Sequence, residues 1–214
     1  MTKNIDILGI SDHTSIKFCG LSRLEDIQAA NELLPQFAGF VFAKGSIRHV
    51  TPERASSMRY LLDEQILAVG VFLDDEEDFV TDLLNRGVID LAQLHGGEDD
   101  DYVERVQKAT GKPVIKAFRI GTDPEEVLRK ASESKADLVL LDSGEGSGVP
   151  FDWNLLHGFT RPFILAGGLT PENVAEAIKR THPYAVDVSS GIETDGVKDP
   201  EKMRAFMEQS REWQ

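Results

Sequence analysis

Short apolar runs recur along the chain, with amphipathic segments between them. Eight runs of strand length are nearly continuous in hydrophobic residues, at positions 16–19, 39–42, 67–72, 91–94, 114–118, 138–141, 163–166 and 185–188. Runs of this kind are typical of strands buried on both faces, as in a parallel sheet covered by helices. The pattern therefore predicts eight parallel strands.

The segments between these runs place apolar residues three and four positions apart, as an amphipathic helix does. Helix start signals occur at 51–53, 122–125 and 170–172, where a threonine or aspartate suited to capping, a proline suited to the first turn and an acidic residue stand together. The sixth connection is the weak one, because residues 151–156 leave room for only about two helical turns before Arg161 and Pro162.

Eight strand–helix units joined by right-handed crossovers close into a barrel, and no linker or change of composition divides this chain. We therefore expect an α/β protein, a single-domain (β/α)8 TIM barrel over residues 14–214, with residues 1–13 as an N-terminal extension. An open doubly wound sheet is the structural alternative, because one miscounted element changes the topology.

Composition narrows the classes of partner. The 214 residues include 23 lysines and arginines against 37 aspartates and glutamates, a net charge of −14, which disfavours nucleic acid and anionic lipid as partners. No apolar run approaches the roughly 20 residues needed to cross a bilayer, the first residues do not resemble a signal peptide, and a single cysteine excludes an intrachain disulfide. We expect a cytoplasmic protein that captures any anionic substrate with local N–H donors and a few placed cations.

Polar residues follow the apolar runs, at the strand ends where a (β/α)8 barrel has its active site. Cys19 ends the first run and Asp142 follows the sixth. A thiol acting as base and a carboxyl acting as acid would move protons on a small substrate without a cofactor. Lys17 shares the strand face of Cys19 and is a candidate for helping the thiol to ionise. The alternatives are a small buried hydrophobic residue for Cys19 and a turn or capping residue for Asp142.

Glycine and serine close the last two predicted strands. Gly167 and Gly168 follow the seventh, and Ser189, Ser190 and Gly191 follow the eighth. Barrels of this type commonly hold a phosphate at this position with backbone N–H groups and a short helix N-terminus, and glycine lets the phosphate oxygens approach. We expect a phosphate site here, with ordinary turn residues as the alternative.

A third flexible loop, Gly146-Ser147-Gly148, follows Asp142 and would serve as a mobile lid, as further N–H donors, or only as a turn. The acidic run 98–101 is typical of a solvated helix N-terminus. No His and Cys stand at ligand spacing, so we expect no metal. His95 and Gln93 could line the same site, but a lone histidine after a strand is more often a hydrogen-bonded packing residue, and we assign His95 no chemistry.

Taken in order, these segments resemble phosphoribosylanthranilate isomerases, the cofactor-free enzyme family of tryptophan biosynthesis. The matching segments extend over nearly the whole chain, at 17–21, 39–42, 46–50, 93–98, 141–143, 146–153, 165–169 and 186–193. The resemblance implies a (β/α)8 barrel and an Amadori rearrangement of N-(5′-phosphoribosyl)anthranilate into 1-(2-carboxyphenylamino)-1-deoxyribulose 5-phosphate.

The resemblance also implies a role for four side chains. Asp142 resembles the general acid that protonates the ribose ring oxygen, and Cys19 the general base that removes the C2′ proton. Arg48 resembles the residue that holds the anthranilate carboxylate, a task suited to a planar cation, and its alternative is a solvated loop arginine. Asp187 resembles a polar contact near the anthranilate amine, and the alternative is an aspartate that only orients neighbouring loops.

The chain departs from the family pattern in three places: Phe18 where an aliphatic residue is usual, Ile47 where proline is common, and the longer N-terminus. None removes a reacting group, but Ile47 gives the loop of Arg48 more freedom. Two other functions stay open, an isomerase of histidine biosynthesis that uses two aspartates, which Cys19 argues against, and a non-catalytic sugar-phosphate-binding module. In each case the partner is a small phosphoribosyl compound, and the chain is expected to be a monomer or a homodimer.

Overall fold

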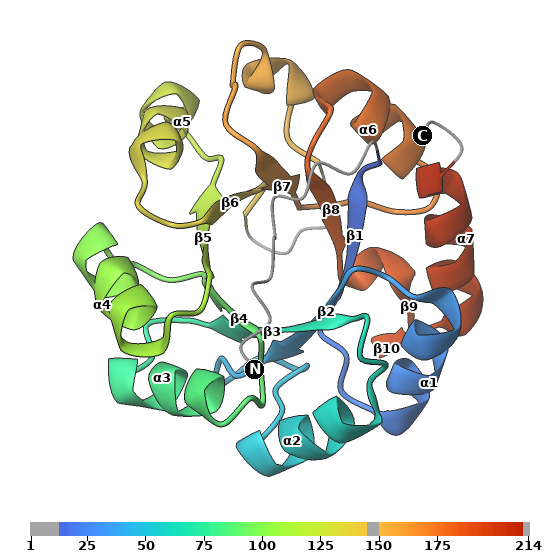
Figure 1. Ribbon diagram of the computed structural model, residues 1–214. Helices are drawn as coiled ribbons and strands as arrows, with labels where there is room; N and C mark the ends of the chain where they lie inside the picture. The colour runs from blue at the N-terminus through green and yellow to red at the C-terminus, as the bar shows by residue number, and fades with distance from the viewer. Residues whose placement is uncertain (1–12, 145–149, 212–214) are drawn as a thin grey trace.

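The computed structural model describes residues 13–144 and 150–211. Its eight long strands form one closed barrel in chain order, and β8 returns to pair with β1 in parallel. Seen along the barrel axis, the helices form an outer ring around the sheet (Figure 1). The predicted (β/α)8 barrel is therefore confirmed, and the open-sheet alternative is wrong because the pairing of β1 with β8 closes the sheet.

The strand bounds lie within two residues of the predicted ones. β2 begins at Phe37 rather than at 39, because Phe37 already pairs with Lys17 of β1. The barrel strands are β1 (Ser15–Cys19), β2 (Phe37–Val41), β3 (Leu67–Phe72), β4 (Leu91–Leu94), β5 (Val114–Arg119), β6 (Leu138–Asp142), β7 (Phe163–Leu165) and β8 (Ala185–Val188).

Helices follow the strands, and a small hairpin follows β8. The helices are α1 (Leu24–Leu33), α2 (Pro52–Leu61), α3 (Glu77–Asn85), α4 (Asp100–Thr110), α5 (Pro124–Glu133), α6 (Val174–Thr181) and α7 (Pro200–Arg211), with the 3-10 helices η1 (Trp153–Leu156) and η2 (Ser190–Ile192). The hairpin strands are β9 (Glu193–Thr194) and β10 (Val197–Lys198). The extension expected over residues 1–13 lies, except for His13, outside the described residues.

Two of the three predicted start signals begin helices. Thr51 caps α2 by accepting a hydrogen bond from the Arg54 N–H at 3.3 Å, and Asp123 caps α5 by accepting from the Glu126 N–H at 3.2 Å. In both helices proline stands in the first turn, where it removes no needed N–H donor.

The third signal is wrong, because α6 begins at Val174 rather than at 170–172. The Thr170 N–H donates to Asn173 Oδ1 at 2.9 Å, and Asn173 Nδ2 donates to the Gly168 carbonyl at 2.9 Å. These hydrogen bonds make residues 170–173 a turn that shapes the loop after β7. The sixth connection is short as predicted, with the four residues of η1 as its helix.

Side chains that alternate along the strands divide the core into two parts. Outward residues such as Phe18 and Phe40 pack under the helices. Inward residues fill the lower barrel with an apolar layer made of Phe37, Val69, Leu91, Ile115, Ala117, Leu138, Leu140, Ile164, Ala166 and Ala185. Above this layer the inward positions become polar, with Lys17, Gln93 and Asp187 on the same strand faces. The barrel is thus closed below by apolar packing and polar above, at the strand C-termini.

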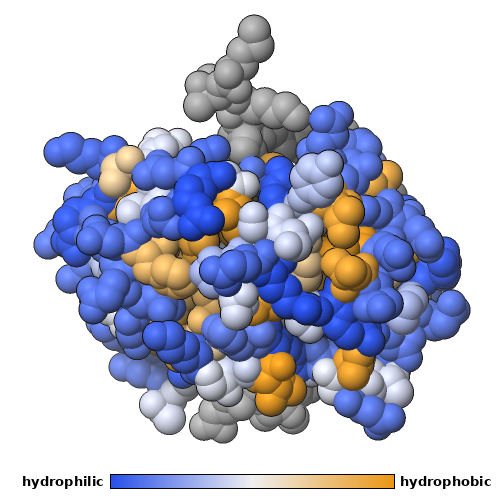
Figure 2. Space-filling view, turned by 90° about the horizontal axis from the view of Figure 1, so that it is seen from below, coloured by the Kyte–Doolittle hydropathy of each residue, from blue (hydrophilic) through white to orange (hydrophobic). Residues whose placement is uncertain are grey.

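The outer surface agrees with the acidic composition. In the space-filling view hydrophilic residues cover most of the visible face, and hydrophobic residues appear in small separated groups (Figure 2). Over residues 13–144 and 150–211, no helix combines the length and the apolar character that crossing a membrane requires.

Candidate active site

One cavity of about 200 Å³ lies at the C-terminal ends of the strands. It brings together eight of the predicted site residues from distant parts of the chain, namely Cys19, Arg48, Asp142, Gly167, Gly168, Asp187, Ser189 and Ser190. Val71, Gln93, His95, Ser143, Ala166 and Leu169 complete its lining. Gly191 lies next to this lining without contributing to it, and Gly146, Ser147 and Gly148 lie outside the described residues.

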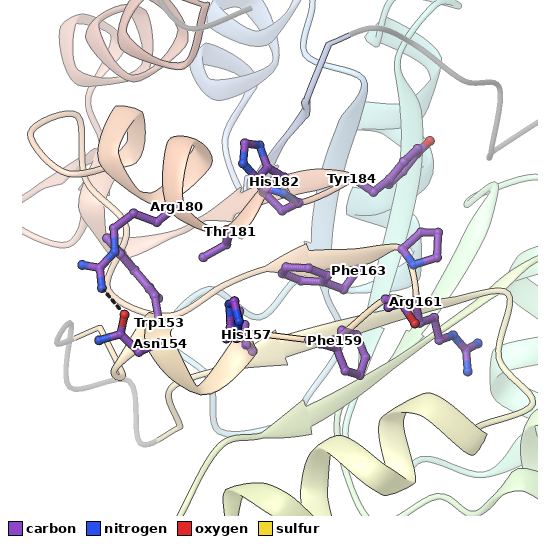
Figure 3. A pocket seen from close by; sticks show the side chains of 15 residues that line it. Trp153, Asn154, His157, Phe159, Arg161, Phe163, Arg180, Thr181, His182 and Tyr184 are labelled. Atoms are coloured by element: carbon purple, nitrogen blue, oxygen red, sulfur yellow. Dashed lines mark hydrogen bonds between the residues drawn. The ribbon is translucent and has the colours of Figure 1, made fainter.

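A larger cavity of about 520 Å³ lies where β7 and β8 begin, at the other end of these strands (Figure 3). The two arginines that line it already have partners within the protein. Arg180 stacks on Trp153 and donates to Asn154 Oδ1 at 2.9 Å, and Arg161 donates to backbone carbonyls at the end of α5. Because barrel enzymes carry out their chemistry at the C-terminal ends of the strands, we place the candidate site in the smaller cavity.

Cys19 lies in the wall of this cavity beside a buried ion pair. Lys17 stands opposite Asp187 in the β1–β8 register, and its ammonium donates to Asp187 Oδ1 at 2.6 Å. The Lys17 side chain is fully buried, and its ammonium also interacts with the Cys19 sulfur. The sequence placed Lys17 on the face of Cys19 without showing whether it reaches the thiol, and the structure brings the two side chains together, with Asp187 in direct contact with the lysine.

Burial and charge act on these groups in opposite directions. Burial raises the pKa of the Cys19 thiol and the Asp187 carboxylate raises it further, whereas Lys17 and Lys198 lower it, and the net result is a raised pKa. Burial by itself would lower the pKa of Lys17, but the charges of Asp187 and Cys19 outweigh burial, so its pKa is raised. Lys17 thus remains an ammonium ion beside the thiol.

Asp142 faces the same cavity and is held by His95. His95 Nε2 lies 3.3 Å from Asp142 Oδ2, and Gln93 Nε2 lies 3.1 Å from His95 Nδ1. With the Gln93 amide as donor, the imidazole Nε2 carries the hydrogen and donates it to Asp142. Burial raises the pKa of Asp142, but His95 and the Gly144 N–H outweigh burial, and the pKa lies below its ordinary value. Gln93 Oε1 is buried and has no hydrogen-bond partner within the described residues.

Arg48 is held in place by Glu193, the first residue of β9. Its Nε and Nη2 donate to the two Glu193 carboxylate oxygens at 2.6 and 2.7 Å, a bidentate pair. Lys198 donates to Glu193 Oε1 at 2.6 Å and to the Ser189 carbonyl at 2.9 Å. Gly20 has a φ of +77°, and a Cβ there would lie 2.5 Å from Arg48 Cδ, so only glycine lets the arginine cross at this point. The solvated-loop alternative for Arg48 is wrong.

The glycine loops after β7 and β8 also have a packing role. A Cβ on Gly167, whose φ is +87°, would overlap the Ser143 hydroxyl and lie 2.7 Å from Asp142 Oδ1. A Cβ on Gly191 would overlap the Leu169 carbonyl. These glycines therefore let the loops after β6, β7 and β8 pack against one another at the cavity. This packing requires glycine at both positions whether or not a ligand is bound.

Some residues near the site have partners that the sequence pattern did not indicate. The expectation that the whole acidic run 98–101 is solvated is wrong for Glu98, whose side chain is 2% exposed and accepts from Lys116 at 2.8 Å and from the Asp74 and Gly96 N–H groups. Asp99 does cap α4, as expected for a helix N-terminus. Glu193 and His95 stand inside matched motifs, but nothing in their spacing indicated Arg48 and Asp142 as their partners.

Comparison with known proteins adds independent information. A family model described as N-(5′-phosphoribosyl)anthranilate (PRA) isomerase matches residues 16–209. The N-(5′-phosphoribosyl)anthranilate isomerase of Endomicrobium trichonymphae is 47% identical over an aligned length of 193 residues, and the alignment covers 88% of this chain and 94% of that protein. The chain belongs to the N-(5′-phosphoribosyl)anthranilate isomerase family. The resemblance found in the sequence is confirmed, and so is the predicted class of enzyme, an isomerase of tryptophan biosynthesis.

Solved structures of phosphoribosylanthranilate isomerases have the same fold. One, in complex with reduced 1-(o-carboxyphenylamino)-1-deoxyribulose 5-phosphate, is 33% identical with a TM-score of 0.81, over 92% of this chain and 98% of that chain. Another, of monomers generated from the dimeric isomerase of Thermotoga maritima, is 31% identical with a TM-score of 0.81, over 93% of this chain and 99% of that chain. The family thus includes a protein that binds a phosphoribulose ligand and one that forms dimers.

Proposed function

We propose that this isomerase converts N-(5′-phosphoribosyl)anthranilate into 1-(2-carboxyphenylamino)-1-deoxyribulose 5-phosphate by acid–base catalysis within the 200 Å³ cavity. The observation that carries the proposal is that Cys19, from β1, and Asp142, from β6, line the same cavity together with a cation suited to a carboxylate, Arg48. The reaction is an isomerisation, so every proton removed is returned and no cofactor is needed.

In this mechanism Asp142 donates a proton to the ribose ring oxygen, which opens the ring and leaves an iminium ion. The positive nitrogen makes the C2′ hydrogen acidic, and Cys19 removes it to give an enolamine that tautomerises to the ketone. The base is the thiolate, the minor form of a thiol whose pKa is raised, and the charges of Lys17 and Lys198 favour it. Because the pKa of Asp142 lies below its ordinary value in the ligand-free protein, the carboxyl needs a source of protons. In this assignment the proton comes from solvent, and His95, with Nε2 3.3 Å from Asp142 Oδ2, orients the carboxyl.

The two ends of the substrate carry negative charge, and the cavity offers each end a partner. We assign the phosphate to the loops containing Gly167, Gly168, Ser189 and Ser190, where backbone N–H groups and two hydroxyls are present. We assign the anthranilate carboxylate to Arg48, because a guanidinium that already holds Glu193 by Nε and Nη2 retains N–H groups for a second carboxylate. Gly191 supports the phosphate loop through its contact with Leu169.

We assign Asp187 to the contact with the substrate amine. The same carboxylate also forms the ion pair with Lys17. Gly146, Ser147 and Gly148 are kept as candidate phosphate contacts on the resemblance alone. Because the proposed base is a free thiol, we propose the reducing cytoplasm as the site of action. The proposed assembly is a monomer or a homodimer.

Two variants test the proposal directly. Cys19→Ala and Asp142→Asn are each expected to lower kcat at least about a hundredfold, the range of a lost general acid or base, with native folding retained. Asp123→Asn is the matched control, because it exchanges the same functional groups at the cap of α5, where asparagine caps equally well. Purified enzyme should be assayed with N-(5′-phosphoribosyl)anthranilate, and expression should restore growth of a tryptophan auxotroph lacking this isomerase.

The results separate this function from the alternatives. Near wild-type turnover in either variant would exclude that residue from the proposed role. Activity on the phosphoribosyl substrate of the histidine-pathway isomerase in place of the anthranilate compound would favour the histidine isomerase. Ligand binding without turnover, and growth that does not depend on Cys19, would favour a non-catalytic sugar-phosphate-binding module.

A further inference from the structure

Lys17 is a fully buried lysine to which the proposed proton transfers give no task. Its side chain has 0% exposure, and its ammonium lies 2.6 Å from Asp187 Oδ1 on the neighbouring strand. Burying a lysine costs free energy even when it is paired, because the ion pair repays only part of the lost hydration. A pair in this position, at the cavity wall and beside Cys19, therefore calls for a functional explanation.

Lys17 and Cys19 point to the same side of β1, toward the same residue of β2. A Cβ placed on Gly39 would lie 3.0 Å from Cys19 Sγ and 3.3 Å from Lys17 Nζ. The absence of a side chain at Gly39 thus leaves the space in which ammonium and sulfur lie next to each other. Asp187 pairs with Lys17 from the opposite side, on β8.

Four charged groups act on the sulfur from the elements around it: Lys17 on β1, Asp187 on β8, Lys198 on β10 and Arg48 after β2. Arg48 and Lys198 share one counter-ion, since both donate to the Glu193 carboxylate. Lys17 is the cation whose ammonium shares with the sulfur the space beside Gly39. Its charge is divided between that sulfur and Asp187.

We propose that Lys17 is a positioning residue that sets the acidity of Cys19, and that Asp187 limits its effect. The Lys17 ammonium stabilises the thiolate, and the Asp187 carboxylate draws the same ammonium away and repels the thiolate. Removing the two charges should therefore shift the thiol pKa in opposite directions. This inference rests on the proposed function, in which Cys19 is the base, but it can be measured without substrate.

The experiment uses the fact that Cys19 is the only cysteine in the chain. The rate of alkylation by iodoacetamide as a function of pH reports the pKa of this thiol alone. Lys17→Met is expected to raise the pKa by about one unit or more, and Asp187→Asn to lower it by a similar amount, since a charge within about 4–6 Å shifts a pKa by about 1–3 units. Shifts of opposite sign support the inference, because a merely structural loss would move both variants the same way.

Two double variants complete the experiment, the first of which avoids leaving a buried charge without its partner. Lys17→Met with Asp187→Asn removes the whole pair, and compared with Asp187→Asn alone it isolates the charge of Lys17. Lys116→Met with Glu98→Gln is the matched control, because it removes another buried lysine–carboxylate pair, at 2.8 Å, away from the cysteine. The control should leave the thiol pKa at the wild-type value.

Equal thiol pKa values in Asp187→Asn and in the double variant at positions 17 and 187 would overturn the inference, as would a shift of the same size in the control. Isomerase activity separates this result from a failure of the proposed function. An inactive wild-type protein with the expected shifts would reject the function and retain the effect of Lys17 on the thiol. An active enzyme with an unshifted thiol would reject the inference alone.

Discussion

Gly39 links the packing of the barrel to the position of the proposed base, and Gly39→Ala tests both. In the β1–β2 register Gly39 stands opposite Cys19, and its carbonyl accepts from the Gly20 and Leu21 N–H groups at 2.9 and 3.0 Å. A Cβ here would lie 3.1 Å from Cys19 Cα as well as 3.0 Å from its sulfur. The backbone contact cannot be relieved by rotating a side chain, so β1 and β2 must move apart slightly.

Overpacking of a well-packed interior typically costs about 1–3 kcal/mol, and in a chain of this size each kcal/mol lowers the melting temperature by roughly 2–4 °C. We expect Gly39→Ala to melt about 2–12 °C below the wild type on this basis. The displaced sulfur should also lie farther from the Lys17 ammonium, which would raise the thiol pKa and slow its alkylation at pH about 8.

Thermal unfolding followed by circular dichroism gives the stability, and iodoacetamide alkylation gives the local effect on Cys19. Gly121→Ala is the control, since a Cβ at Gly121 meets no atom of the described residues within 4 Å. It should leave both measurements unchanged or raise the stability slightly. A Gly39→Ala protein with the melting temperature and the alkylation rate of the wild type would refute the packing argument.

The remaining predictions concern charged groups around the site. Glu193→Gln keeps the shape of the side chain but removes the charge that holds Arg48. Because a hydrogen bond between charged groups contributes roughly 1.5–3 kcal/mol, this variant should raise KM about tenfold at similar kcat. An unchanged KM in steady-state kinetics would remove Glu193 from this role. Lys116→Met leaves Glu98 buried without its cation and should lower the free energy of unfolding by about 3–5 kcal/mol. Adding Glu98→Gln to Lys116→Met removes the unpaired charge and should largely restore the stability. Equal denaturant midpoints for the single and the double variant would contradict this. Because the pKa of Asp142 lies below its ordinary value of about 3.9, ionised Asp142 stabilises the native state above that pH, and the contribution is lost as the pH falls through the native pKa. Asp142→Asn should therefore lose less stability than the wild type below pH about 4, and identical acid unfolding curves would argue against it.

The elements of the barrel could be predicted from the sequence because their signals are local. A strand buried on both faces is a short apolar run wherever it lies in the barrel, and the predicted bounds of β3, β4 and β8 agree with the structure. The start of α6 was predicted wrongly because short-range side-chain hydrogen bonds of Asn173, to the Thr170 N–H and the Gly168 carbonyl, hold residues 170–173 in a turn. Closure of the sheet, by contrast, depends on β1 and β8, the strands farthest apart in the chain.

The same division applies to the site. The sequence by itself determined which residues stand at strand ends, and the geometry of parallel barrels then assigns Cys19 and Asp142 to one end of the molecule. Only the tertiary structure decided which side chains contact these residues and their neighbours. His95 is the partner of Asp142, and Asp187 is the partner of Lys17, the lysine beside Cys19. Which side chains meet across two strands depends on register and on the curvature of the closed sheet, and these follow from packing the whole barrel at once rather than from any single segment.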